Sequence, residues 1–226
     1  MADDEWMKVD IGWGVDADAS EDDEEGGDDR YSFQRLQMYK RATTTQQMRI
    51  LGEESLNKVA DWHWEPGTAY HFISGGDVDA LSYLRLVLHQ QKAEYFLLSS
   101  WCIGDNDGQE MEEWQRKGLF RHSDFYTGEI LKARYTACLD SLQRIVAKNG
   151  GRIARFRNHS KVMVVYGERF DCVIESSANC NCNPRTEQTV ITVDTGLCDF
   201  YKNFYDGIKD FDNRYKDWEK WERERK

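Results

Sequence analysis

Apolar residues follow the period of a strand and the period of a helix in turn from about residue 60 onward. Short apolar runs predict strands over residues 70–73, 95–101, 152–157, 161–166, 170–175 and 188–193. Helical spacing predicts one helix through residues 81–88 and another from Thr127 to about Lys148, which Gly150-Gly151 closes. Residues 104–108 are polar and indicate a loop. Because helices separate the strands, we expect an α/β layered fold, with a mixed β-sheet flanked by helices.

Aromatic residues near the C-terminus have the spacing of one helix face: Phe200, Phe204, Phe211, Tyr215 and Trp218. The pattern predicts a helix through this whole region. We expect that helix to cover the sheet, and a role as a dimer surface is the alternative.

The N-terminal part differs in composition from the rest. Residues 1–29 hold 13 acidic residues and one base, a balance of −12, whereas the remaining residues balance at +1. Self-repulsion and the lack of apolar periodicity predict a disordered acidic tail over 1–29. Residues 30–60 are expected to form a helical extension, and 61–226 the main domain. A tail that only solvates the chain is the simplest interpretation. The alternative is that it docks a basic partner or occupies a basic patch of its own chain, and Trp6 and Trp13 keep this alternative open because aromatic residues are unusual in a purely solvating tail.

Composition limits the class of protein. The chain has 226 residues, of which 40% are hydrophobic, enough for a sizeable core. No run of 18 apolar residues is present, so we expect no membrane span. No secretory signal is visible, and six cysteines without one indicate reduced thiols and a cytoplasmic location. Cys180 and Cys182 lack the spacing of a zinc site, so buried thiols and no metal are expected.

The strongest chemical signal lies between residues 152 and 188. His159 and Lys161 are two residues apart at the start of an apolar strand, and Ser177 and Asn179 repeat that spacing after a later strand. Period-2 geometry puts each pair on one face. If the two strands are neighbours, an imidazole, an ammonium, a hydroxyl and an amide converge. Such a set suits a phosphodiester, because the imidazole attacks phosphorus or protonates a leaving oxygen and the others stabilise negative charge.

These residues resemble the signature of the phospholipase D superfamily, His-x-Lys followed by Gly/Ser-Ser-x-Asn. The match is His159-Ser160-Lys161, Ser176-Ser177-Ala178-Asn179 and the downstream Asn183-Pro184-Arg185-x-Glu187-Gln188. The chain is most similar to the small single-motif, nuclease-like members found in bacteria and their phages. It departs from the pattern at Tyr166, where the family often has Asp, and Asp171 is a candidate replacement.

The resemblance implies a mechanism without metal or cofactor. Two His-x-Lys motifs form one site, in which one His becomes a phosphohistidine and the other protonates the leaving alcohol. Glu187 would orient His159. None of His63, His71, His89 and His122 is followed two places later by Lys. One copy therefore supplies half a site, and a homodimer would complete it.

The charge near the motif favours a polyanionic substrate. Between Ser141 and Gly167 there are six bases and no acid. We expect Arg152, Arg155, Arg157 and Arg185 to contact nucleic acid. The predicted function is therefore hydrolysis of phosphodiester bonds, most simply in nucleic acid. A phospholipid substrate on the same fold, a non-catalytic module that binds nucleic acid or protein, and a solvated basic face without function are the alternatives.

Overall fold

The computed structural model describes residues 55–57, 63–76, 78–181, 185–212, 214–215 and 217–223. These residues belong to one compact unit, Arg41–Lys226. The predicted tail, most of the predicted extension and residues 182–184 lie outside the described residues. Within the predicted extension, residues 55–57 are helical, and Leu56 is buried in the core.

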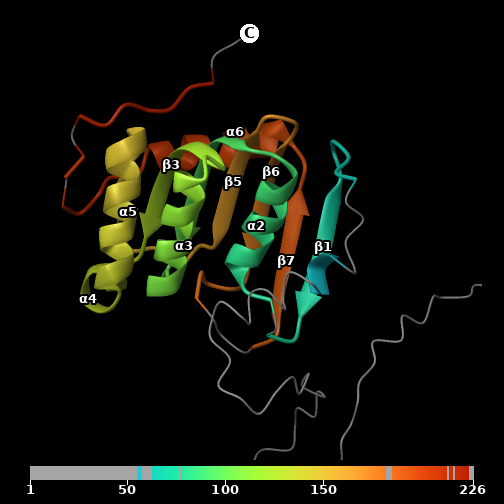
Figure 1. Cartoon of the computed structure of the whole chain (residues 1–226), viewed down its shortest axis with the longest axis horizontal. Coiled ribbons are helices and arrows are strands. Elements are labelled where there is room, and N and C mark those ends of the chain that lie inside the picture. Colours follow the sequence, from blue (N-terminus) through green and yellow to red (C-terminus); the bar gives the residue numbers. More distant parts are fainter. Residues whose placement is uncertain are drawn as a thin grey trace, which may run out of the picture. The chain divides into compact units, whose positions relative to one another are not determined.

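One mixed sheet organises the described chain, with its strands in the order β1-β7-β6-β5-β2-β3-β4 (Figure 1). The strands β2, β3 and β4, at one end of this order, are parallel to one another, and the pairs β2–β5, β5–β6, β6–β7 and β7–β1 are antiparallel. The strand bounds are β1 (Ala69–Ser74), β2 (Ala93–Ser100), β3 (Phe120–Thr127), β4 (Ile153–Arg155), β5 (Val162–Gly167), β6 (Asp171–Ser176) and β7 (Glu187–Thr192).

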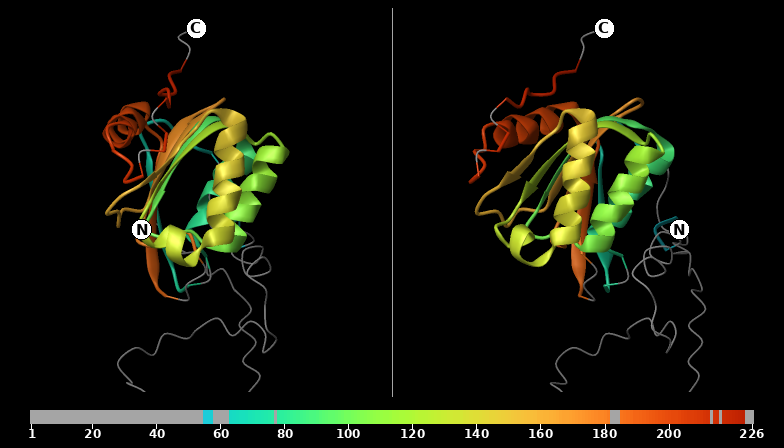
Figure 2. Two further views of the ribbon diagram at one scale, coloured as in Figure 1. Left: turned by 90° about the vertical axis from the view of Figure 1, so that its left-hand side faces the viewer. Right: turned by 60° about the vertical axis from the view of Figure 1, so that its left-hand side comes forward.

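Helices cover both faces of the sheet (Figure 2). They are α2 (Ala80–Gln90), α3 (Asp105–Arg116), α4 (Ile130–Arg134), α5 (Thr136–Asn149) and α6 (Thr195–Asp206). The helices α2, α3 and α5 pack on one face, where Phe96 and Leu98 of β2 point. The helix α6 packs on the other face, against Tyr95 and Leu97. This alternation along β2 is what a strand buried on both faces requires, and the expected α/β fold is confirmed.

Two elements were not predicted. The expected loop at 104–108 is wrong, because α3 begins at Asp105; its buried face includes only two large apolar residues, Met111 and Trp114. At Gly108 an added Cβ would lie 2.9 Å from Cys138 of α5, so glycine permits the close approach of these helices. Strand β3 was missed because polar residues, among them Ser123 and Asp124, occupy a buried strand.

The C-terminal prediction is wrong beyond residue 206. α6 ends at Asp206, and the described residues that follow have no helical structure. Instead, the Trp221 ring stacks on buried Tyr95 with 4.7 Å between ring centroids. The periodicity of Phe211, Tyr215 and Trp218 therefore did not reflect a helix face.

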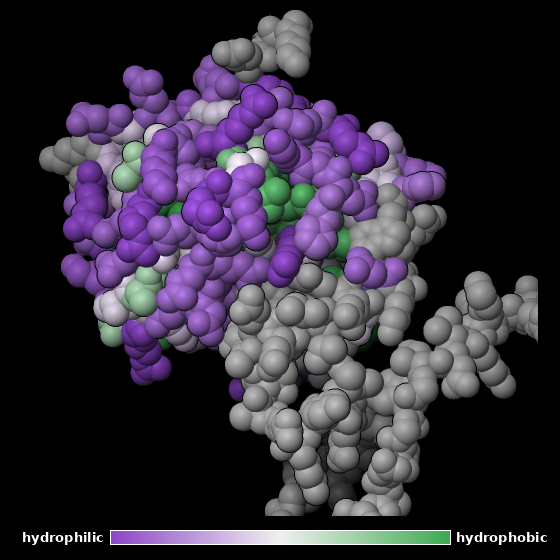
Figure 3. Space-filling view, in the orientation of Figure 1, coloured by the Kyte–Doolittle hydropathy of each residue, from purple (hydrophilic) through white to green (hydrophobic). Residues whose placement is uncertain are grey.

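The outward face of the helices is polar. In the orientation of Figure 1 the surface is mostly hydrophilic, with a smaller hydrophobic area near its middle (Figure 3). Among the described residues, no helix combines the length and the apolar character needed to cross a bilayer.

Candidate active site

Several strands begin or end at one edge of the sheet, namely the edge formed by the carboxyl ends of the parallel strands. The parallel strands β2, β3 and β4 end there, β6 also ends there, and the antiparallel strands β5 and β7 begin there. All five predicted catalytic residues lie at these ends: His159, Lys161, Ser177 and Asn179 just outside the strands and Glu187 as the first residue of β7. The topology thus brings together residues that lie as far as 28 positions apart, because β5 and β6 are direct neighbours.

His159 lies in the loop that joins β4 to β5 and is exposed to solvent. The Lys161 ammonium donates to the His159 backbone oxygen at 2.7 Å and lies 3.3 Å from His159 Nδ1. On another side, the Trp101 ring centroid is 5.8 Å from that of the imidazole. The exposed imidazole therefore has a cation and an aromatic ring beside it.

Ser177 and Glu187 form the second part of the site. The Ser177 hydroxyl donates to the Glu187 carboxylate and accepts from the Gln188 backbone N–H at 3.0 Å. The neighbouring backbone is fixed by Ser176 N–H, which donates to Lys161 O at 3.0 Å. Glu187 was expected to orient His159, but its hydrogen-bond partner among the described residues is Ser177.

Asn179 adjoins the site from the loop after β6. Its side-chain oxygen lies 3.5 Å from the hydroxyl of Ser100 at the end of β2. That hydroxyl also donates to Cys102 O at 2.7 Å and accepts from Cys180 N–H at 3.2 Å. Ser100 therefore ties the loop that carries Asn179 to the end of β2.

Burial and neighbouring groups shift the pKa of Lys161 in opposite directions. Partial burial lowers the pKa of Lys161, while the nearby Cys102, Glu187 and Cys180 act in the opposite direction. The effect of burial is the larger, because removing an ammonium from water penalises its charged form. The carboxylate of Glu187 thus acts on Lys161 as well as on Ser177.

Several residues that support the site were missed by the sequence patterns. The buried side chain of Asn158 bonds the ends of β2 and β3, and Ser160 bonds Ser99 and Tyr205. The only local signal was their position on either side of His159. Ser99 and Tyr205 lie 60 positions before and 46 after His159, so the sequence alone offers no sign of this contact.

Arg152 does not lie at the surface, which corrects the expectation that it binds nucleic acid. Its residue is 7% exposed. Its guanidinium donates to the backbone oxygens of Tyr205 and Ile208 and to the Tyr126 hydroxyl, and it lies 3.8 Å from the Trp218 ring centroid. Arg152 holds the end of α6 and the C-terminal segment instead.

The remaining bases of the predicted patch divide into paired and unpaired ones. Arg155 forms an ion pair with Asp212, and Arg144 forms one with Glu112 at 2.8 Å. Arg157 and Arg185 are exposed and have no ion pair with a described residue. The basic surface next to His159 is therefore smaller than the sequence indicated.

The departures from the family pattern have structural partners. Tyr166 donates its hydroxyl proton to Asp199 at 2.7 Å. Asp171 lies across from Tyr166 in the β5–β6 ladder and accepts from Gly167 N–H, Thr195 and Arg223. Both residues sit at the end of the hairpin away from Lys161, so Asp171 supports the hairpin rather than the edge that carries His159.

The cysteines near the motif are part of the interior. Cys102, Cys172 and Cys180 are buried, and Cys182 lies outside the described residues. Burial raises the pKa of the Cys102 thiol, which keeps it protonated at neutral pH.

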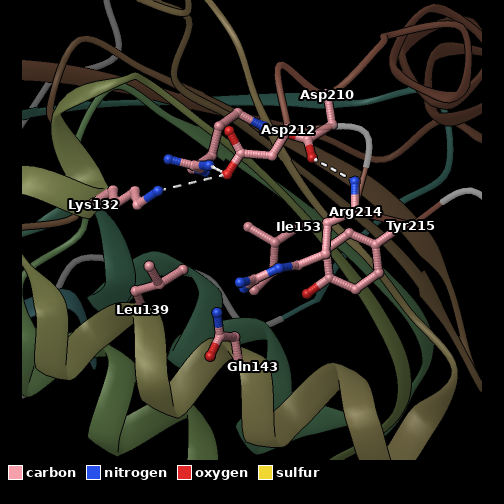
Figure 4. Close-up of a pocket in the computed structure, with 9 residues that line it drawn as sticks. Lys132, Leu139, Gln143, Ile153, Asp210, Asp212, Arg214 and Tyr215 are labelled. Carbon is pink, nitrogen blue, oxygen red and sulfur yellow. Dashed lines mark hydrogen bonds and ion pairs between the residues drawn. The ribbon is translucent and has the colours of Figure 1, made fainter.

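A small pocket of about 80 Å³ lies beside β4, apart from His159 (Figure 4). Asp212 pairs there with Arg155 and lies 3.9 Å from Lys132. The carboxylate thus already compensates these two cations. The lining residues are Lys132, Leu139, Gln143, Ile153, Arg155, Asp210, Asp212, Arg214 and Tyr215.

Comparison with known proteins gives likenesses to solved structures only. No family model and no curated protein match the sequence. The chain is similar to a phospholipase D family member, Nuc from Salmonella typhimurium, at 12% identity and a TM-score of 0.44, covering 69% of this chain and 99% of that one. It is similar to NucT from Helicobacter pylori at 13% identity and a TM-score of 0.45, covering 62% and 93%.

Polyphosphate kinase from Porphyromonas gingivalis is a third similar structure, at 16% identity and a TM-score of 0.45. The match covers 61% of this chain and 25% of the kinase, so the chain spans about a quarter of that protein's length. At these identities and TM-scores the likenesses do not decide a function. The side chains at the edge of the sheet carry the functional information instead.

Proposed function

We propose that the chain is a metal-independent phosphodiesterase of the phospholipase D type that hydrolyses nucleic acid. The observation that carries the proposal is the exposed imidazole of His159 with the Lys161 ammonium 3.3 Å from its Nδ1. Ser177 and Asn179 lie at the same edge. A nucleophile, a cation and a neutral hydrogen-bond donor such as the Asn179 amide are the groups that phosphoryl transfer to an imidazole needs.

The proposed reaction has two steps. His159 Nε2 attacks phosphorus, the bond between phosphorus and the leaving oxygen breaks, and a second imidazolium gives its proton to that oxygen. Lys161 and Asn179 then donate to the phosphoryl oxygens, and Ser177 keeps its contact with Glu187. Water next attacks phosphorus and gives a proton to the second imidazole, and the bond between phosphorus and His159 Nε2 breaks, which restores both histidines.

The second imidazole comes from another copy of the chain in this proposal. The other histidines lie on other elements: His71 on β1, His89 on α2 and His122 on β3, with His63 before β1. A two-fold axis next to His159 would place two identical motifs face to face. The homodimer thereby provides the nucleophile and the general acid from the same residue.

Nucleic acid is the proposed substrate because two exposed arginines flank the site in the sequence. Arg157 precedes His159 by two residues and Arg185 precedes Glu187 by two. Guanidinium groups bind phosphates next to the one that is cleaved. The proposal leaves out Arg152, which is buried, and assigns Arg155 first to its ion pair with Asp212.

Labelled single- and double-stranded DNA and RNA, incubated with the protein in a chelator, test the proposal. Cleavage by the wild type is expected, with a loss of at least about 1,000-fold in His159→Ala. His71→Ala, which removes an exposed histidine on β1, is the matched control and should retain activity. Release of head group from phospholipid vesicles without cleavage of nucleic acid would mean that the substrate is a phospholipid and not nucleic acid. Binding of nucleic acid without cleavage by either the wild type or His159→Ala would favour the non-catalytic module.

The acidic tail is proposed to compete with nucleic acid for the basic residues of the main domain. The tail carries −12 and the rest of the chain +1. Removal of residues 1–29 should raise the affinity for nucleic acid at low salt, and high salt should abolish the difference. Equal affinities at low salt would contradict this role.

A further inference from the structure

The buried side-chain amide of Asn158 fixes the loop that carries His159. Residues 158–161 belong to no strand, yet Asn158 is only 6% exposed. Its Nδ2 donates to Tyr126 O at 2.9 Å, to Ser99 Oγ at 3.0 Å and to Ser100 O at 3.3 Å. The amide therefore joins the ends of β2 and β3 to the residue that precedes His159.

The other half of the amide fixes the residue that follows His159. Asn158 Oδ1 accepts from Ser160 N–H at 3.0 Å and from Ser160 Oγ at 2.7 Å. An amide oxygen cannot donate, so the single hydroxyl proton of Ser160 points toward Asn158. Asn158 thus bonds across His159 to the backbone N–H and the hydroxyl of Ser160.

This proton assignment fixes the direction of two more hydrogen bonds. Ser160 Oγ lies 2.8 Å from Ser99 Oγ and 2.7 Å from the Tyr205 hydroxyl. Because the Ser160 proton is already used, both partners must donate to Ser160. Asn158, Ser99 and Ser160 then form a closed ring of hydrogen bonds, and Tyr205 adds one from outside. Such connected bonds strengthen one another.

The hydroxyl of Tyr205 is suited to donate this hydrogen bond to Ser160. Tyr205 is 2% exposed, and burial raises the pKa of its hydroxyl, which therefore keeps its proton. It lies in the last turn of α6, where Arg152 donates to its backbone oxygen at 2.9 Å. A helix on one face of the sheet is in this way bonded to the residue beside His159.

We propose that Asn158, Ser160 and Tyr205 are positioning residues that hold the imidazole of His159 and the ammonium of Lys161 in their reactive arrangement. The inference rests on the proposed role of His159. None of the three touches the reacting atoms; they act through the backbone on either side of His159. A looser loop lowers the rate of the chemical step more than substrate binding, since the nucleophile spends less time aligned with phosphorus.

Tyr205→Phe tests this, because it removes one hydroxyl and little else. Tyr201→Phe is the matched control: it lies on the same helix, and its hydroxyl donates to Glu175 instead. Ser160→Ala, at an exposed position, is a second variant that does not depend on the packing of α6. The readouts are the kcat and KM of cleavage, the NMR resonances of the His159 ring and the exchange rate of the backbone amide proton at position 160, relative to the intrinsic rate of the residue there.

Tyr205→Phe and Ser160→Ala are expected to lower kcat by about tenfold with KM within about twofold, and to shift the His159 resonances. Faster exchange of the backbone amide at position 160 should accompany both, while Tyr201→Phe resembles the wild type. His159 resonances and exchange at position 160 that are the same in all four proteins would overturn the inference. The NMR readouts need no turnover. If the wild type cleaves nothing, the proposed function fails, and the positioning contacts are still judged by the resonances.

Discussion

At the scale of single residues, Lys161 shows how burial and charge act on one side chain. Partial burial lowers its pKa, and Cys102, Glu187 and Cys180 partly offset that effect. The proposed reaction needs the charged form, because a neutral amine does not stabilise the phosphoryl oxygens. The pH dependence of the rate therefore reports on this residue.

We predict that activity falls on the alkaline side at a pH below the ordinary lysine value of about 10.4. The sign follows from the lowered pKa: Lys161 loses its proton earlier than a free lysine as the pH rises. Lys161→Arg should extend the plateau of kcat/KM to higher pH, even at a lower rate, because arginine stays protonated.

A Cys102→Ser variant is the control for this pH profile, since Cys102 lies near Lys161 and also titrates in the alkaline range. It should keep the alkaline limb, shifted to somewhat lower pH, because Cys102 acts to raise the pKa of Lys161; loss of the limb would assign it to Cys102. An alkaline limb that is the same in the wild type and in Lys161→Arg would show that another group is responsible.

At the scale of elements, the end of α6 depends on Arg152. The guanidinium satisfies backbone oxygens of Tyr205 and Ile208, at the helix end where carbonyl groups lack partners within the helix. A cation at this end is also favourable for the helix dipole. Because Tyr205 bonds the loop of His159, the stability of this helix end matters for the site.

Arg152→Lys should lower the free energy of unfolding by about 2 kcal/mol, because an ammonium cannot reproduce the forked hydrogen bonds and the stacking on Trp218. Arg157→Lys is the matched control, since Arg157 is exposed and should change stability by less than about 0.5 kcal/mol. Urea unfolding of the two variants measures the difference. Equal midpoints would mean that the buried contacts of Arg152 contribute little.

The sequence predicted most strands of the sheet but not all its elements. Apolar runs such as Leu97–Leu98 and Val162–Val165 mark buried strands directly. In β3 the buried Asp124 accepts from the Tyr95 hydroxyl at 2.8 Å and from Arg152 N–H at 2.8 Å, and such tertiary partners have no local signal. The same holds after α6, where Trp218 and Trp221 pack on the sheet without forming a helix.

The residues of the candidate site also fall into some that the sequence predicted and some that it did not. His159, Lys161, Ser177 and Asn179 were predicted because strand spacing and a family resemblance point to them. Tyr205 and Ser99 were not, since their contact with Ser160 depends on which strands and helices become neighbours. Sequence charge also overstated the basic surface, because it does not reveal that Arg152 is buried and Arg155 is paired.

At the scale of the whole molecule, the proposed site requires two chains. Each copy contributes one His-x-Lys motif, so both copies must carry His159 for one complete site. This sets the homodimer apart from a monomer that cleaves with a single imidazole.

In mixtures of wild type and His159→Ala that exchange subunits, only dimers of two wild-type chains have a complete site. The remaining activity should therefore equal the square of the wild-type fraction. A linear decrease would mean that each chain works alone. Sedimentation of the same mixtures shows whether dimers are present at the concentrations assayed.

The most direct measurement is the search for a covalent intermediate on His159. The protein is mixed with DNA that carries a labelled phosphate at the cleaved bond, the reaction is stopped in alkali within a turnover, and the protein is digested and analysed. We predict label on the peptide that contains His159, bonded to the imidazole and absent from His159→Ala. Cleavage of the DNA without label on the protein, or with label on another residue, would contradict the account.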